Sequence, residues 1–148
     1  MKIALAAISG SHLMEMLALE DSWSHEEVLF LADRHPQSSR LEQKYRVVYT
    51  DRVENNPLLL IKSLFTSFSL ALSSKPGLAI GMPSSSTFFF LLFSKLLGAK
   101  LIVIEPFGNS EKSGFYSKAL YKFADLFLVQ WQDLLDTFPN GEYSGSVF

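Results

Sequence analysis

Short apolar segments alternate with helical segments along the whole chain, and this alternation limits the possible folds more than any other feature. Strands that alternate with helices favour a parallel sheet covered on both faces. Right-handed crossovers then give a doubly wound, Rossmann-like α/β layer. The 148 residues are the length of one domain, 1–148. Strands are expected at 2–8, 27–32, 45–50, 78–82, 100–105 and 125–130, and helices at 12–20, 56–74, 87–97, 113–123 and 133–138.

The composition favours a folded core and excludes several classes of protein. Hydrophobic residues make up 48% of the chain and charged residues 19%, whereas disordered chains are poor in apolar residues. The net charge of −2 argues against a nucleic-acid partner, which needs clustered positive charge. The absence of cysteine removes disulfides, thiolate metal sites and cysteine nucleophiles. The three histidines show no ligand spacing, so we expect neither a metal site nor a cofactor.

Apolar segments raise the question of a membrane. The first apolar run ends early at Ser9, which favours a buried strand over a secretory signal. The longest stretch without a charge, 76–94, contains two prolines, two glycines and four serines, so we expect no membrane-spanning segment. The helices at 56–74 and 87–97 are apolar enough for two interpretations: core helices, or helices with one face towards a partner or a membrane.

The turn after the first strand, Ser9-Gly10-Ser11-His12, is the first candidate site. Ligands of open α/β sheets bind at the carboxyl ends of strands. The backbone N–H groups of a Gly/Ser turn and a helix N-terminus suit a phosphate or pyrophosphate, although Gly10 also fits a simple tight turn. Glu15 lies three residues after His12, a spacing at which a carboxylate orients an imidazole as a general base. An exposed surface pair is the alternative.

Two further features lie near strand ends. Glu105 ends the strand at 100–105, at the same sheet edge as His12, where a carboxylate binds a hydroxyl or caps a neighbouring loop. The aromatic residues Trp131, Tyr143 and Phe148 stand near the C-terminus. They either anchor a partner chain or pack against the last helix.

Several segments together resemble a known family. The quoted segments are Ser-Gly-Ser-His-Leu-Met-Glu-Met-Leu (9–17), Lys-Pro (75–76), Gly-Ala-Lys-Leu-Ile-Val-Ile-Glu-Pro-Phe (98–107), Ala-Asp-Leu-Phe-Leu-Val-Gln-Trp (124–131) and the ending at 138–148. They resemble the membrane-side subunit of the two-part UDP-N-acetylglucosamine transferase of lipid-linked oligosaccharide assembly. Bacterial members of this family serve capsule and exopolysaccharide synthesis. The segments 98–105 and 124–131 are the specific part of the match.

The resemblance implies the N-terminal, acceptor-side half of a GT-B glycosyltransferase. A separate catalytic glycosyltransferase subunit would supply the C-terminal half and most of the UDP-sugar site, and the chain's end at Phe148 fits that division. Eukaryotic members carry an N-terminal membrane anchor, which we do not expect in this chain, so membrane contact is expected to be peripheral, on the cytoplasmic face. Gly10 and Ser11 would hold the pyrophosphate of a lipid-linked sugar acceptor, and His12 would be the base. Glu15 and Glu105 would orient His12 or the acceptor.

The chain departs from the family pattern where the acceptor should bind. Ser11 replaces the second glycine of the turn, Gly81-Met82-Pro83 replaces Ser-Thr-Gly, and Asn109 occupies the position of an arginine. These changes indicate a different acceptor or a weakened activity. Two other functions stay open: a non-catalytic scaffold that recruits a catalytic partner to the membrane, and a stand-alone nucleotide-binding Rossmann domain. The latter lacks a full dinucleotide fingerprint.

Overall fold

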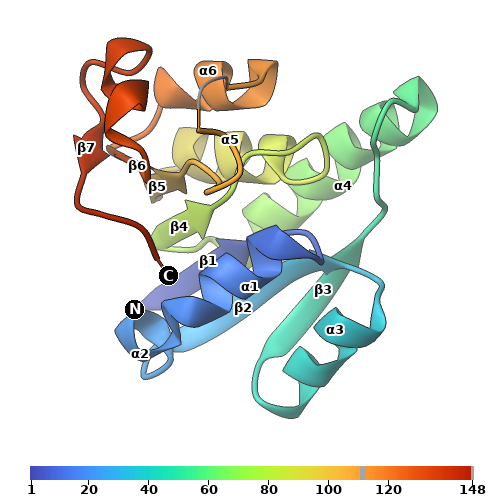
Figure 1. Ribbon diagram of the computed structural model, residues 1–148. Helices are drawn as coiled ribbons and strands as arrows, with labels where there is room; N and C mark the ends of the chain where they lie inside the picture. The colour runs from blue at the N-terminus through green and yellow to red at the C-terminus, as the bar shows by residue number, and fades with distance from the viewer. Residues whose placement is uncertain (111–112, 148) are drawn as a thin grey trace.

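Seven parallel strands form one sheet at the centre of the computed structural model, which describes residues 1–110 and 113–147 (Figure 1). The sheet order is β3-β2-β1-β4-β5-β6-β7. The order reverses between β1 and β4, which is the topological switch point of a doubly wound sheet. The predicted Rossmann-like fold is therefore confirmed. The strands are β1 (Lys2–Ala6), β2 (Glu27–Asp33), β3 (Arg46–Thr50), β4 (Leu78–Gly81), β5 (Lys100–Ile104), β6 (Leu126–Val129) and β7 (Glu142–Tyr143).

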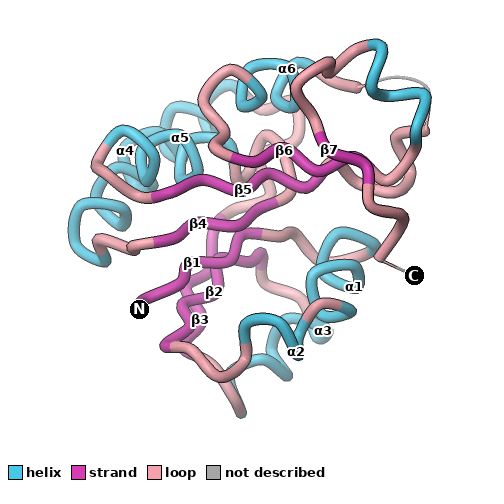
Figure 2. The backbone as a smooth tube through the Cα atoms, turned by 90° about the vertical axis from the view of Figure 1, so that its left-hand side faces the viewer, coloured by secondary structure: helices cyan, strands magenta, loops and turns pink. Residues whose placement is uncertain are grey.

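Helices cover both faces of the sheet. Figure 2 shows α1, α2 and α3 on one face and α4, α5 and α6 on the other. Each face has its own apolar core. Leu13 of α1 packs with Trp23 and Phe30 on one side, and Phe90 and Leu101 lie in the core of the other. The helices are α1 (Ser11–Ala18), α2 (Glu20–Trp23), α3 (Pro36–Ser39), α4 (Pro57–Ser74), α5 (Phe88–Leu96) and α6 (Phe115–Tyr121), with 3₁₀ turns at Arg40–Gln43 and Gln132–Asp136.

Some expected elements differ from the structure. The polar connection after β2 contains α3, which begins because the Nδ1 of His35 accepts the N–H of Gln37 and Pro36 fits the first helical turn. The last predicted helix is a short 3₁₀ turn. The last strand among the described residues is β7, which comes after the last strand expected from the sequence and ends at Tyr143.

The long helix α4 presents its apolar side chains to solvent. Asn56 caps its first turn, and Lys75 ends it in the left-handed conformation, with φ of 43°. Its buried residues are Ser63, Ser67, Ala71 and Ser74. Its exposed residues include Leu58, Ile61, Phe65, Phe68 and Leu72, with Phe65 67% exposed. Of the two interpretations of this helix, the structure therefore favours a face directed outward.

Helix α5 behaves differently, since Phe88, Phe90 and Leu91 are buried in the core. By length and composition α4 alone among the described residues is able to cross a membrane, with a mean hydropathy of 1.4. A single helix of this kind is weak support for a membrane span. The face at Ser63, Ser67 and Ala71 packs against the domain, so α4 lies along the protein.

Candidate functional site

The candidate site lies at the carboxyl end of β1, beside the switch point of the sheet. The turn there requires glycine, because Gly10 has a φ of 106° and a ψ of −145°. The turn leads directly into α1, whose first residue is Ser11. The structure thus has a glycine turn at the carboxyl edge of the sheet, and ligand binding by this turn stays a prediction.

Side chains from the neighbouring segment hold this turn. The N–H of Ser9 donates to Oδ1 of Asp33 at 2.6 Å, and the N–H of Gly10 donates to Oε1 of Gln37 at 2.8 Å. By contrast, the N–H groups of Ser11 and His12 donate to no acceptor within 1–110 and 113–147. A pyrophosphate at this turn would therefore meet the free N–H groups of Ser11 and His12 at the positive end of α1.

His12 has the properties of a proton acceptor. Its ring is half-buried, and its Nδ1 is buried with no hydrogen-bond partner in the described part of the chain. Burial lowers the pKa of His12 below 6.5; the charge of Glu15 opposes this shift and the charge of Arg52 adds to it. His12 is therefore held neutral near pH 7, as a general base must be.

Glu15 is buried, and its hydrogen bonds connect α1 to the segments that follow β5 and β6. Its Oε2 accepts the N–H of Phe107 at 3.0 Å and the Nε2 of Gln130 at 2.7 Å. Gln130 also donates to the carbonyl of Glu105 and accepts the N–H of Val147. The hydrogen bonds of Glu15 thus go to the loop after β5 and to Gln130, and Glu15 acts on His12 only through its charge.

Glu105 lies buried at the end of β5. Its Oε1 accepts hydrogen bonds from Asn109 and from the hydroxyl of Ser117, while Oε2 is buried without a partner among the described residues. Burial raises the pKa of Glu105, against the lowering effect of the hydrogen bonds from Asn109 and Ser117. The structure brings Glu105 and Asn109 together and fits the loop-capping alternative. Their binding of an acceptor stays a prediction.

Two of the three predicted partner-interface residues, Trp131 and Tyr143, lie at the β6–β7 end of the sheet. Trp131 is partly exposed, and its Nε1 donates to the carbonyl of Phe107 at 2.6 Å. Tyr143 is exposed on the edge strand β7. Phe148 lies outside the described residues.

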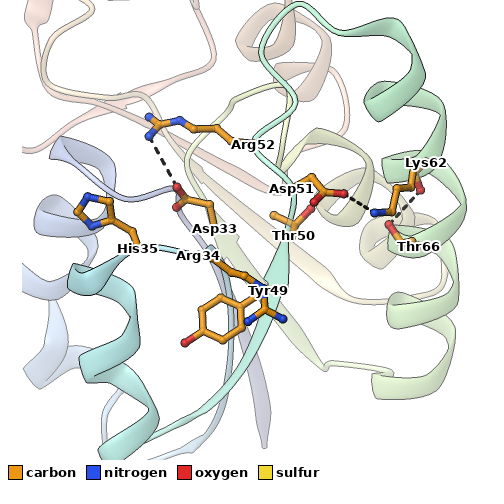
Figure 3. Close-up of a pocket in the computed structure, with 9 residues that line it drawn as sticks. All are labelled: Asp33, Arg34, His35, Tyr49, Thr50, Asp51, Arg52, Lys62 and Thr66. Atoms are coloured by element: carbon orange, nitrogen blue, oxygen red, sulfur yellow. Dashed lines mark hydrogen bonds and ion pairs between the residues drawn. The ribbon is translucent and has the colours of Figure 1, made fainter.

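Sequence reasoning missed a polar cavity of about 530 Å³ at the carboxyl ends of β2 and β3 (Figure 3). Asp33 and Arg52 form an ion pair at its mouth, 3.6 Å apart. Sequence reasoning also missed Gln130. The signal used for Glu105, a polar residue directly after a buried strand, applies equally to Asp33 and Gln130. Among 1–110 and 113–147, no three His, Asp or Glu side chains are grouped to hold a metal ion.

Solved structures share this fold. MurG from Acinetobacter baumannii matches 98% of the chain with a TM-score of 0.76 and 19% identity. A Staphylococcus aureus MnaA–UDP co-structure matches 99% with a TM-score of 0.72 and 13% identity. The chain covers 45% and 44% of those proteins. The fold is therefore that of a Rossmann-like layer equivalent to the N-terminal half of a GT-B enzyme.

Sequence comparisons define the family. The family model "Oligosaccharide biosynthesis protein Alg14 like" matches residues 4–147, so the chain belongs to the Alg14-like family. UDP-N-acetylglucosamine transferase subunit alg14 from Schizosaccharomyces pombe is 36% identical over 69 residues, 44% of this chain and 33% of that protein. The Yarrowia lipolytica subunit ALG14 is 33% identical over 57 residues, 38% of this chain and 26% of that protein. The matched segments thus span about a third or less of these relatives.

Proposed function

We propose that this chain is the acceptor-side subunit of a two-part glycosyltransferase. The reaction would move N-acetylglucosamine or a related hexose from a UDP-sugar to a lipid-linked pyrophosphoryl-sugar acceptor in oligosaccharide or polysaccharide biosynthesis, such as that of capsule or exopolysaccharide. Three findings support this: membership of the Alg14-like family, the naming of its relatives as transferase subunits, and the half-GT-B fold. A separate catalytic subunit would supply the other half and most of the donor site.

The observation that carries the proposal is the half-buried His12 on the first turn of α1, at the switch point of the sheet, whose buried Nδ1 has no hydrogen-bond partner among the described residues. An acceptor hydroxyl would give its proton to His12 as its oxygen bonds to the donor sugar and UDP leaves. The N–H groups of Ser11 and His12 would hold the acceptor pyrophosphate. Glu105 would keep Asn109 in place beside the acceptor.

Mutation of His12 in the reconstituted pair tests this mechanism. A tagged chain extracted in mild detergent should bring down a similarly small glycosyltransferase half in near-equal amount. With that partner, His12→Ala should lower the rate of transfer by about 10²–10⁴-fold. His25→Ala is the matched control, because His25 is exposed and precedes β2, at the amino ends of the strands. Transfer by His12→Ala at the wild-type rate would remove His12 from the mechanism.

The pH profile gives a second readout. Because the pKa of His12 lies below 6.5, the base is present at neutral pH and is lost as the pH falls through that lowered pKa. Transfer by the wild-type pair should therefore decline only on the acid side of pH 6.5. The residual activity of His12→Ala should lack this decline.

The docking surface for the catalytic subunit is proposed at the β6–β7 end of the sheet. β7 is the last strand in the sheet order, so its outer edge has no neighbouring strand among the described residues. Trp131 follows β6, Tyr143 lies on β7, and both are exposed; large aromatic side chains are frequent anchors of interfaces. A strand edge beside exposed aromatic residues suits a partner chain.

The apolar face of α4 is proposed to bind a membrane surface peripherally, on the cytoplasmic side. Between Glu54 and Glu105 the chain has four lysines and no acidic residue. Two of them, Lys62 and Lys75, belong to α4 or its C-terminal cap. Exposed apolar side chains beside lysines, with no carboxylates between, suit a bilayer that contains anionic lipids. This contact would bring the acceptor site to its lipid-linked substrate.

The exposed face of α4 also favours a second candidate, the non-catalytic scaffold that recruits the partner to the membrane. Under that function, substitutions at Gly10, His12 and Glu105 would leave transfer intact, whereas polar substitutions on α4 would abolish it. The His12→Ala experiment therefore separates the two functions.

A further inference from the structure

The cavity between β2, β3 and α4 is the polar feature that the proposed mechanism leaves unused. Figure 3 shows side chains from three segments around it. Arg34 follows β2, Arg52 follows β3, and Lys62 comes from the second turn of α4. Three cationic side chains from separate segments thus line one cavity of about 530 Å³.

Both guanidinium groups have unused hydrogen-bond donors. Arg52 lies 3.6 Å from Asp33 and 3.8 Å from Glu54, and Arg34 lies over the ring of Tyr49 at 4.7 Å. Neither guanidinium donates a direct hydrogen bond to any residue of the described ranges. Each carries five N–H donors in a planar fork, and that geometry matches a phosphate group.

The carboxylates nearby are already engaged. Asp33 accepts the N–H of Ser9, and Asp51 pairs with Lys62 at 2.6 Å. Arg34 has no carboxylate partner within the structure's described residues. The Asp51–Lys62 pair is exposed, and because exposed ion pairs in water are weak, an incoming anion would exchange for this pair readily. The cavity is therefore better suited to an anion than to a cation.

Hydrogen bonds connect the cavity to the candidate site. Asp33 holds the turn at Ser9, and Gln37, whose N–H donates to His35 at the cavity wall, accepts the N–H of Gly10. On its other side, Lys62 adjoins Ile61 of the apolar face of α4. The cavity thus lies between the turn and the surface proposed to meet lipid.

We propose that this cavity binds a phosphate group through Arg34, Arg52 and Lys62. The inference rests on the proposed function, in which one phosphate of the acceptor pyrophosphate lies in this cavity and the other meets the N–H groups of Ser11 and His12. The head group of an anionic phospholipid offers the same chemistry. The two arginines would donate hydrogen bonds to phosphate oxygens, while the sugar of the acceptor extends towards His12.

Direct binding tests the site without a partner subunit. The probe is inorganic pyrophosphate, measured by isothermal titration calorimetry with the full chain. The double variant Arg34→Gln/Arg52→Gln should weaken binding by at least about tenfold. Arg46→Gln, an exposed arginine at the start of β3 and so at the opposite edge, should bind like the wild type. Equal thermal unfolding of the three proteins would show that the variants fold.

Vesicles distinguish the two sources of phosphate. Wild type and double variant are compared on vesicles of phosphatidylglycerol and of phosphatidylcholine. If the double variant binds pyrophosphate more weakly than the wild type but binds phosphatidylglycerol vesicles equally well, the phosphate belongs to the acceptor. If only its binding to phosphatidylglycerol vesicles is weaker, the phosphate belongs to a lipid head group. Wild-type binding by the double variant to both probes would overturn the site, and so would failure of the wild type to bind either.

Assays of sugar transfer test the phosphate site separately from the proposed glycosyltransferase function. With the partner present, the double variant should raise the KM for acceptor and leave the KM for UDP-sugar unchanged. An unchanged KM for acceptor would overturn the acceptor assignment and leave the glycosyltransferase function standing. Pyrophosphate binding through these arginines, in a pair that transfers no sugar, would instead overturn the function and leave the phosphate site.

Discussion

Helices α1 and α4 pack on opposite faces of one sheet and bury opposite kinds of residue. In α1, Leu13 and Met16 are fully buried. In α4, the buried positions hold Ser63 and Ala71, while Phe65 is 67% exposed. The helical period therefore shows that a helix has two faces, but it does not show which face meets the sheet.

The neighbours of α4 explain the difference. The core on its side of the sheet is filled by large side chains of α5 and β5, including Phe90 and Leu101. The small residues of α4 let its backbone approach them closely. Phe68 lies at the border, with its ring against that of Phe93 at 5.3 Å. Since the core needs no large side chains from α4, its exposed apolar face is free for contact outside the domain.

The largest expected effect is on stability. Leu13→Ala on α1 should lower the free energy of unfolding by about 2–5 kcal/mol, because it leaves a cavity in a packed core. Phe65→Ala on α4 removes more carbon atoms, yet it should change that free energy by less than about 0.5 kcal/mol. Urea unfolding of the two variants measures both values. Similar losses would mean that Phe65 is buried and that the contrast between the helices is wrong.

The fold was predictable because buried strands and amphipathic helices leave strong local patterns. The apolar run at 2–8, for example, indicates a strand buried on both faces. The short helix α3 was missed because its start depends on the ring of His35, a residue rarely found at a helix cap. Strand β7 has two residues, too few for any period to show.

The site was predictable only in part, because its contacts are long-range. The turn at Gly10 and the proximity of Glu105 to Asn109 follow from local spacing. The bond from Gln130 to Glu15 joins residues 115 positions apart, so no spacing rule finds it. The ion pair between Asp33 and Arg52 depends likewise on the pairing of β2 with β3.

A membrane assay sharpens the contrast between the helices. Phe65→Ser should weaken binding to vesicles with anionic lipid by about ten- to a hundredfold, because the variant loses the free energy gained when the Phe65 ring moves from water into the bilayer. Met14→Ser is the matched control, because Met14 is 53% exposed on α1, on the opposite face. Sedimentation with vesicles measures both. Equal weakening by Met14→Ser would show that the two faces do not differ in lipid contact.

The smallest effect concerns two buried serines on the two sides of the sheet. On the side of α1, the hydroxyl of Ser38 donates to the carbonyl of Asp33. On α4, the hydroxyl of Ser63 is buried without a partner among the described residues. Ser38→Ala removes this hydrogen bond and leaves the buried carbonyl of Asp33 without that donor, so it should lower the free energy of unfolding by about 1–3 kcal/mol. Ser63→Ala removes a buried hydroxyl that has no hydrogen-bond partner, so the free energy of unfolding should stay unchanged or rise slightly.

Urea unfolding of the two variants measures both changes. A clear loss with Ser63→Ala would show that this hydroxyl is hydrogen-bonded in solution, and that small size alone does not explain why serine lines the inner face of α4.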